Sequence, residues 1–493
     1  MVSVTNVLYY YVNILYNSNI SHKTGIYGNL CLNIFLRKVK LYLGKWESKK
    51  LRTLFDKNLL TDVHLKQMTY KDLNAVLQYD LELFRKISCH IYEMDLAKLK
   101  KQSKIRVVFF VNTDSVWSCD RLYRLFELDE RFEPFIVVPG FNNGTSITIR
   151  ETYESTVQFF KEKGYKIIGV WDNGAEKSGW DEIGVPDIIF HLTPYLNMLP
   201  STFNIFHVPL SCLNVYIPYS LATVSELWWY NAPGIHLAWL QVCESSLTRE
   251  MYGKSSITGP DNIVVLGHPK IDSLISPGVS LDIRSYWKIP KEVEPNKIMK
   301  IIYAPHHSIS NSINYSTFHQ NYKYILNYAK THSESTSWIV RPHPLLKKAC
   351  VDAGIFQTEA DYDAFMEEWD MLPNARYIPF GTYTDFFLTS DIMITDCGSF
   401  ILEYQYLKKP LIMLTRADRK MNELGNANLE CLYQVSGDNI MAIQTMFDLL
   451  ILQKNDWLKE KRDQFYNSFL NIPQKGGGTA SENIYKYVTS QVS

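Results

Sequence analysis

The sequence predicts an α/β protein made of two successive domains, each a doubly wound parallel sheet with helices on both faces. Short apolar segments alternate with amphipathic helical segments from Ile105 to Leu266, and a second series of the same kind begins at Lys300. Between the two series, residues 276–297 are rich in proline, glycine and charge, which is typical of a linker. The length of 493 residues is enough for two or three domains.

The composition argues against several classes of protein. The chain has 51 basic and 51 acidic residues, so general affinity for nucleic acid is not expected. Its eight cysteines are scattered, with no CxxC pair and no metal-ligand spacing, which indicates a reducing cytoplasm and predicts no metal site. No Walker A loop, GxGxxG or HExxH motif occurs, and this disfavours P-loop hydrolases, Rossmann dehydrogenases and zinc peptidases.

Residues 1–103 are predicted to form a helical extension. The uncharged stretch before Lys23 is interrupted by asparagines and has no basic residues ahead of it, so it predicts neither a signal peptide nor a spanning helix. Residues 33–54 combine apolar side chains at helical spacing with many lysines and arginines. This pattern fits a surface helix that contacts an anionic membrane or a polyanionic acceptor, and equally a packed helix with a solvated basic face.

Residues 104–275 are predicted to be the first doubly wound domain. They open with the strand Val107–Val111, a helix from Cys119 to Leu128 and the strand Phe135–Val138, which together make a βαβ unit. From Ile188 to Ser225 the chain has no Asp, Glu, Lys or Arg but several prolines. Such a segment is typical of buried loop and strand, and the alternative is a wall that meets a substrate.

Residues 298–475 are predicted to be the second domain, and residues 476–493 a C-terminal helix after a glycine turn, capped by Thr479 or Ser481. Five strands are expected in the second domain, with the sequences IIYAP, WIVRP, RYIPF, DIMITD and PLIML. Doubly wound sheets bind ligands at the carboxyl ends of their strands. The loops after these strands are therefore the candidate site.

Polar residues gather in three of these loops, and the convergence of three loops at one sheet edge predicts a single site. His343 stands between two prolines, which fix its backbone and suit it to acid–base work or to donation to a phosphate oxygen. Arg341 offers a fork for phosphate oxygens, with an ordinary ion pair as the alternative. The candidate catalytic residues are His343, His307 and His306, and the candidate donor-binding residues are Arg341, Ser308, Thr395, Asp396, Gly398, Ser399 and Glu403.

The stretch Asp391–Leu414 defines the anion-binding part of this candidate site. An apolar strand ends at Asp396, a tight turn follows, and a helix opens near Ser399. Free backbone N–H groups at such a helix start attract phosphate. Glu403 lies four residues after Ser399 on the same helical face, where a carboxylate can accept hydrogen bonds from ribose hydroxyls.

The segments GHPKID, YAPHHS, VRPHP and DIMITDCGSFILEYQYLKKPLIML resemble, in order and spacing, the C-terminal half of the CDP-glycerol glycerophosphotransferase family. The resemblance covers about Ile263 to Ser481 and places His343, Asp396 and Ser399 on family motif positions. Members of that family are bacterial GT-B enzymes of teichoic acid and capsule synthesis. The chain departs from the family patterns at Cys397, Gly398, Lys270 and the His306–His307 pair, and it has no HGTPxK segment.

The resemblance implies a GT-B fold with a donor domain and an acceptor domain. It implies transfer of glycerol phosphate, or a related polyol phosphate, from a CDP-activated donor to a hydroxyl of a polysaccharide or lipid-linked acceptor. The donor is a substrate and no cofactor is expected; the place of action is the cytoplasm or the inner face of the cell membrane. TDCGSFILEY also resembles a motif of UDP-N-acetylglucosamine 2-epimerases, so a nucleotide-sugar enzyme of the same fold is one alternative and a non-catalytic GT-B scaffold another.

Overall fold

The computed structural model describes residues 49–53, 69–140, 148–172, 175–176, 179–194, 196, 200, 202–221, 223, 229–277, 281–310, 314–417, 419–472, 476 and 478–493. The chain divides into two compact units between His90 and Ile91. In the first unit, α4 (Tyr70–Tyr79) begins with a capping box formed by Thr69 and Asp72, and α5 (Leu81–Leu99) starts in this unit and continues into the second. The described residues of the predicted N-terminal extension are mostly helical. Of the basic segment 33–54, only residues 49–53 are described, so that hypothesis lies outside the structure.

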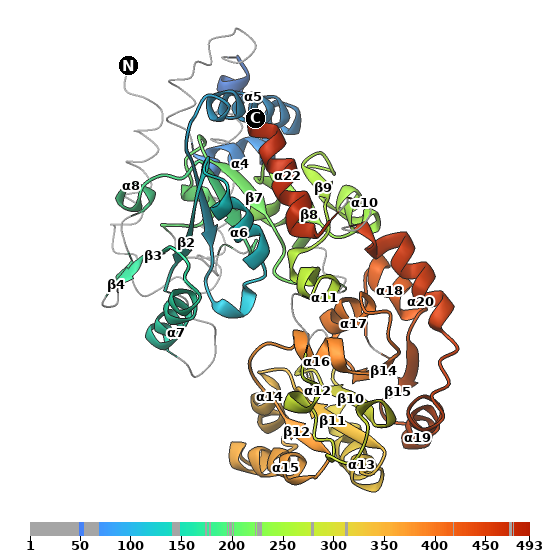
Figure 1. Ribbon diagram of the computed structural model, residues 1–493. Helices are drawn as coiled ribbons and strands as arrows, with labels where there is room; N and C mark the ends of the chain where they lie inside the picture. Colours follow the sequence, from blue (N-terminus) through green and yellow to red (C-terminus); the bar gives the residue numbers. More distant parts are fainter. Residues whose placement is uncertain are drawn as a thin grey trace, which may run out of the picture. The chain divides into compact units, whose positions relative to one another are not determined.

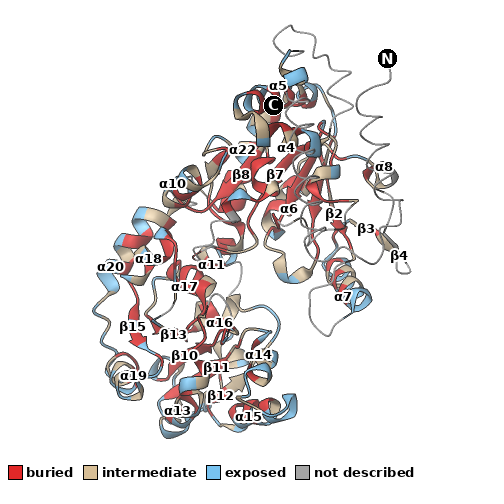
Figure 2. Ribbon diagram, turned by 180° about the vertical axis from the view of Figure 1, so that it is seen from behind, coloured by how far each residue is buried: buried red, intermediate tan, exposed pale blue. Residues whose placement is uncertain are grey.

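The second unit contains two parallel sheets (Figure 1), and the first has seven strands in the order β3-β2-β1-β6-β7-β8-β9. Strands β1 to β3 are added toward one edge of the sheet, and strands β6 to β9 toward the other edge. This reversal of strand order between β1 and β6 is the doubly wound arrangement. The strands are mostly buried (Figure 2), as expected for a parallel sheet covered on both faces. Their bounds are β1 Ile105–Phe110, β2 Phe132–Val138, β3 Ile167–Gly169, β6 Ile188–His191, β7 Leu213–Tyr216, β8 Leu240–Cys243 and β9 Ile263–Val265.

The second sheet has six parallel strands in the order β12-β11-β10-β13-β14-β15, and its reversal lies between β10 and β13. The five predicted strands are all present. The sixth, β15, was missed because only every second residue of it is buried, so it has no continuous apolar run. The bounds are β10 Met299–Ala304, β11 Thr336–Val340, β12 Ala375–Tyr377, β13 Ile392–Thr395, β14 Leu411–Thr415 and β15 Tyr433–Ser436.

Helices connect the strands, and a two-stranded antiparallel ribbon, β4 (Trp171–Asp172) with β5 (Ala175–Glu176), stands apart from both sheets. Several helices begin with a side-chain cap; in α15, for example, Thr358 and Asp361 form a capping box. The bounds are α6 Asp120–Leu128, α7 Ile149–Glu162, α8 Trp180–Ile183, α9 Pro233–His236, α10 Ser246–Ser255, α11 Asp272–Ile275, α12 Ile283–Tyr286, α13 Phe318–Thr331, α14 Leu346–Asp352, α15 Glu359–Met371, α16 Thr384–Thr389, α17 Gly398–Gln405, α18 Glu423–Leu429, α19 Ile440–Phe447, α20 Lys459–Phe465 and α22 Ala480–Val492.

The C-terminal helix α22 returns to the first sheet and packs beside α6 (Figure 1). Thr479 caps it as the sequence predicts, and the buried carboxylate of Asp272 accepts hydrogen bonds from the backbone N–H groups of Ala480 (2.8 Å) and Ser481 (3.0 Å). Ile484 and Val488 join the core under the first sheet. The last residues of the chain therefore complete the core of the first sheet rather than that of the second.

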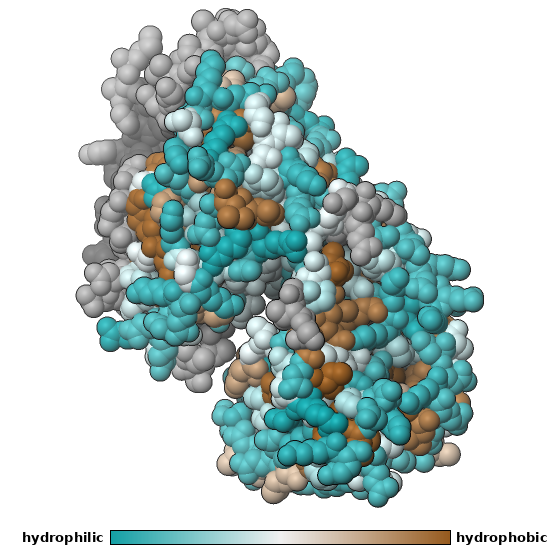
Figure 3. Space-filling model, in the orientation of Figure 1, coloured by the Kyte–Doolittle hydropathy of each residue, from teal (hydrophilic) through white to brown (hydrophobic). Residues whose placement is uncertain are grey.

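No helix in the described part of the chain combines the length and apolarity that crossing a membrane requires. On the face drawn in Figure 3, most of the described residues are hydrophilic, and the apolar ones are interspersed among them.

Candidate active site

The three polar loops singled out in the sequence start side by side at the carboxyl edge of the second sheet. Ala304 at the end of β10 pairs with Thr395 at the end of β13, so the loops that follow them leave the sheet at its reversal point. The loop after β11 joins them, because the His343 N–H donates to the Pro305 carbonyl (2.9 Å) and the Arg341 N–H to the Tyr303 carbonyl (2.8 Å). This is the part of a doubly wound sheet where ligands bind.

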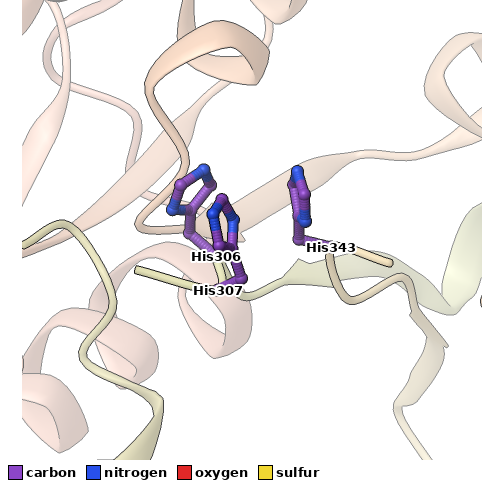
Figure 4. Close-up of side chains that lie close together, drawn as sticks. All are labelled: His306, His307 and His343. Carbon is purple, nitrogen blue, oxygen red and sulfur yellow. The ribbon is translucent and has the colours of Figure 1, made fainter. Parts of the chain in front are cut away.

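Three imidazole rings meet at this edge (Figure 4). The centroid of the His307 ring lies 4.3 Å from that of His306 and 4.1 Å from that of His343, and the outer pair is 5.0 Å apart. One ring nitrogen from each residue lies within 4.8 Å of the other two. His306 is buried and the other two are half-buried. Such a group is able either to hold a metal ion through lone pairs or to bind an anion through N–H groups.

The hydrogen bonds of His306 and His343 within their own loops favour binding of an anion over binding of a metal ion. The Nδ1 atom of His306 accepts from the Ser308 backbone N–H (3.2 Å), and the Nδ1 atom of His343 accepts from the Leu345 N–H (3.1 Å). A neutral imidazole that accepts at Nδ1 carries its proton on Nε2. His268 has the same turn, accepting from the Lys270 N–H at Nδ1, and its Nε2 contacts the Pro218 carbonyl (2.7 Å), which only accepts. His306 and His343 therefore present N–H donors, whereas a metal ion needs lone pairs.

The rings are uncharged in the unliganded protein. Burial, together with the charges of His307 and His343, lowers the pKa of His306 to about 2. Burial, with His307 beside it, lowers the pKa of His343 to about 3, and burial also lowers the pKa of His307. The Nδ1 atom of His307 is buried and has no hydrogen-bond partner. His307 is thus the one member of the cluster whose proton position no local bond fixes.

These pKa values predict that acid destabilises the protein. Above about pH 6.5, the ordinary pKa of histidine, the imidazoles are neutral in both the folded and the unfolded chain. As the pH falls below 6.5, the unfolded chain takes up protons at His306 and His343 that the folded chain does not, so the free energy of unfolding falls by up to about 1.4 kcal/mol per pH unit for each of these two histidines. Denaturant unfolding at pH 6.5 and pH 5 measures the slope. His306→Asn keeps an acceptor for the Ser308 N–H and should reduce the slope; an unchanged slope would contradict a neutral His306.

Asp396 lies beneath the cluster as an anchor. It is buried, and its carboxylate accepts from the backbone N–H groups of His306 (2.5 Å) and Thr317 (2.6 Å) and from the Thr317 hydroxyl (3.1 Å). Burial raises its pKa to about 6, against the effect of these hydrogen bonds. Thr395, also buried, donates to the Ala304 carbonyl (2.6 Å) and accepts from the Cys397 N–H. These two predicted donor-binding residues hold the loops together and expose no group to a ligand.

Helix α17 starts at Gly398, where the backbone is crowded. A Cβ atom on Gly398 would lie 2.8 Å from the Tyr315 ring and 3.2 Å from the Thr223 hydroxyl, which donates to the Gly398 carbonyl (2.7 Å). The glycine that departs from the family motif is therefore required by close packing. Ser399 is half-buried, and its hydroxyl contacts the sulfur of Cys397 (3.5 Å).

Arg341 and Glu403 have partners within the protein. The Arg341 guanidinium donates to the carbonyls of Ile378 (2.9 Å) and Gly381 (2.6 Å), and burial lowers its pKa. Glu403 is fully buried, with one carboxylate oxygen 2.9 Å from the Lys270 ammonium and the other accepting from the Tyr383 hydroxyl (2.6 Å). Burial acts to lower the pKa of Lys270, but the attraction of Glu403 raises it. Because these contacts occupy Glu403, the expected ribose contact has no counterpart in this conformation.

Sequence reasoning missed two residues that border the site. Thr223 belongs to the first series of elements, yet it is buried against α17, and its carbonyl accepts from the Asn422 N–H (2.9 Å). No local sequence pattern predicts such a long-range contact. Arg419 follows β14, in the sequence TRADRK directly after the predicted strand PLIML. The rule that identified the other loops, polar residues after a strand, would have found it.

With this geometry established, comparison with known proteins identifies the family. Residues 240–490 match the model of the CDP-Glycerol:Poly(glycerophosphate) glycerophosphotransferase family, which is just over half of the chain. The chain belongs to this family. It is thus a glycerophosphotransferase of the kind that the sequence motifs indicated, and the matched region contains all three histidines. No curated protein matches the chain.

Solved structures show the fold of this glycerophosphotransferase. The wall teichoic acid polymerase TagF matches with a TM-score of 0.50 at 14% identity, covering 90% of this chain and 98% of the polymerase chain. The UDP-GlcNAc 2-epimerase from Neisseria meningitidis matches with a TM-score of 0.50 at 14% identity, covering 78% of this chain and 100% of the epimerase chain. The two-sheet GT-B-like fold is confirmed, and the fold by itself does not distinguish transferase from epimerase.

Proposed function

We propose that this glycerophosphotransferase moves glycerol phosphate, or a closely related polyol phosphate, from a CDP-activated donor to a hydroxyl of a teichoic-acid-like or capsular polymer. The observation that carries the proposal is the group of three neutral imidazoles at the reversal point of the second sheet. Two of these neighbouring rings carry N–H donors at Nε2, and N–H donors are what a diphosphate needs. Family membership supplies the donor and acceptor classes.

The reaction is a displacement at phosphorus. The acceptor hydroxyl attacks the β-phosphorus of CDP-glycerol, the bond from that phosphorus to the bridging oxygen breaks, and CMP leaves with the electron pair. The Nε2–H groups of His306 and His343 bind the phosphoryl oxygens as negative charge shifts to the leaving group. His307, whose Nδ1 atom is unpartnered, takes the proton from the attacking hydroxyl. Atoms and charge balance without an oxidant or a cofactor.

Of the remaining candidate residues, some are proposed to contact the donor and others to hold the loops of the site in place. The backbone N–H groups at the start of α17 and the Ser399 hydroxyl lie at the same sheet edge and suit the diphosphate. Arg341 orders the loop from Ile378 to Gly381, and its remaining N–H groups are available to a phosphate oxygen. Asp396, Thr395 and Ser308 hold the loops. On this proposal the second sheet, within residues 298–475, binds the donor, and the first sheet, within residues 104–275, receives the acceptor.

A nucleotide panel tests the function. Purified protein is incubated with a poly(glycerophosphate) primer and, in turn, CDP-glycerol, UDP-N-acetylglucosamine and a CMP-linked sugar, and the released nucleotide is identified. We expect CMP release with CDP-glycerol, together with lengthening of the primer. Release of UDP, or epimerisation of the UDP-sugar, would establish the nucleotide-sugar alternative. Failure of every nucleotide to bind, measured as absence of thermal stabilisation, would favour a non-catalytic scaffold.

A further inference from the structure

A second cationic element borders the candidate active site, in the loop after β14. Three internal contacts involve described residues of this loop. Arg416 donates from Nη1 to the Ile309 carbonyl (2.8 Å), and Tyr315 donates from its hydroxyl to the Lys420 carbonyl (3.2 Å). The Asn422 N–H donates to the Thr223 carbonyl (2.9 Å). Arg419 therefore occupies a loop that is held on both sides of it.

The loop lies against the histidine cluster through Tyr315. The centroid of the Tyr315 ring lies 5.7 Å from that of the His306 ring. A Cβ atom added to Gly398 would lie 2.8 Å from the Cε2 atom of the same Tyr315 ring. Tyr315 thus separates the first histidine from the start of α17. Its hydroxyl holds the residue next to Arg419, so Arg419 lies at the same edge of the sheet as the three histidines.

Among the described residues, the Arg419 guanidinium has no carboxylate as an ion-pair partner. Its Nη1 atom is buried and has no hydrogen-bond acceptor among them. Burial lowers the pKa of Arg419, while the nearby Tyr315 and Asp396 act to raise it. Asp396 forms no ion pair with Arg419; its carboxylate oxygens accept from the N–H groups of His306 and Thr317. A buried charged group without an acceptor destabilises the folded protein, and a bound anion would offset that unfavourable free energy.

Three other buried cations in the described part of the chain have charged or carbonyl partners, although Nη1 of Arg462 also lacks an acceptor. Arg462 is fully buried and pairs with Asp456, and Lys409 donates to the carbonyls of Phe387 (2.9 Å), Leu388 (2.6 Å) and Ser390 (2.7 Å). Arg341 donates to two carbonyls. Arg462 has a buried Nη1 without an acceptor but pairs with Asp456. Arg419 combines such a nitrogen with the lack of an ion pair to any described carboxylate, in a loop next to the proposed diphosphate site.

We infer that Arg419 is a phosphate-binding residue that contacts the diphosphate of the nucleotide donor from the loop after β14. This inference rests on the proposed function and adds to it a binding residue outside the loops of His306 and His343. The anion has two conceivable sources, since the donor carries a diphosphate and the acceptor polymer carries phosphodiesters. The fixed loop beside Tyr315 and Gly398 favours the donor, and binding measured without acceptor distinguishes the two.

The test compares Arg419→Gln with wild type by calorimetric titration of cytidine, CMP and CDP-glycerol in the absence of acceptor. We expect dissociation constants for CMP and CDP-glycerol to rise about 10- to 100-fold, as for loss of a hydrogen-bonded charge, and cytidine binding to stay unchanged. Arg419→Lys should recover part of the affinity, because lysine restores the charge but not the fork. Lys420→Gln, which removes an exposed positive charge from the same loop, is the matched control and should bind like wild type.

Melting of the unliganded proteins separates binding from a structural role. Since the guanidinium forms no ion pair with any carboxylate in the described part of the chain, Arg419→Gln should melt at or above the wild-type temperature; a marked fall would show that Arg419 supports the fold. Unchanged affinity of Arg419→Gln for CMP and CDP-glycerol would overturn the inference and leave the proposed function intact, and a raised KM for the polymer alone would assign the residue to the acceptor. If wild type binds no cytidine nucleotide, the proposed function itself fails.

Discussion

His343→Asn should lower kcat/KM for glycerol phosphate transfer by about 10²- to 10⁴-fold while leaving the fold intact. The asparagine side-chain oxygen takes the place of Nδ1 and accepts from the Leu345 N–H, so the loop keeps its shape. The lost group is the Nε2–H donor, which the proposal places on the phosphoryl oxygens. Steady-state release of CMP from CDP-glycerol, with saturating primer, measures the effect.

His332→Asn is the control for this substitution. His332 ends α13 and precedes β11, so it lies at the opposite, amino edge of the same sheet. Its ring packs on Tyr328. The variant should transfer glycerol phosphate at the wild-type rate. Full activity in His343→Asn would remove His343 from the mechanism, and equal losses in both variants would point to a general effect on the fold.

Asp396→Ala should destabilise the protein by about 2–4 kcal/mol and reduce transfer by about 100-fold. The substitution leaves the buried N–H groups of His306 and Thr317 without an acceptor, and it frees the loop that positions His306. Urea unfolding gives the free energy, and transfer assays at a temperature where the variant is folded give the rate. We expect the folded variant to lose activity, because Asp396 positions the histidine cluster.

Asp361→Ala provides the matched comparison. Asp361 also accepts from a backbone N–H and a hydroxyl, both of Thr358, but it does so in an exposed capping box at the start of α15. Water replaces those bonds when the carboxylate is removed, so the cost should be about 1 kcal/mol, with normal transfer. If Asp396→Ala lowered the free energy of unfolding by a similarly small amount, the buried hydrogen bonds of Asp396 would be no stronger than exposed ones. That result would contradict the role proposed for Asp396.

The sequence predicted the fold and the position of the site because both follow from local patterns. Apolar runs separated by helical segments identify a parallel sheet, and polar residues directly after those runs mark its carboxyl edge. β15 escaped this reasoning because alternate burial leaves it without an apolar run. The roles of single residues were harder to predict. Asp396 and Glu403 were expected to face the donor, but a carboxylate in a sequence does not reveal whether its partners are ligand atoms or the protein's own N–H groups.

The amino-acid sequence by itself determined the two-sheet architecture, the family and the clustering of His306, His307 and His343 at one edge. Those properties depend on periodicity and on motif order along the chain. Tertiary structure alone decided which atoms face a ligand. The turns that direct Ser308 and Leu345 N–H groups onto Nδ1 fix the Nε2 protons, and long-range contacts occupy Glu403 and leave the buried Nη1 of Arg419 without an acceptor. A hydrogen bond between residues distant in the chain exists only after folding has brought its donor to its acceptor.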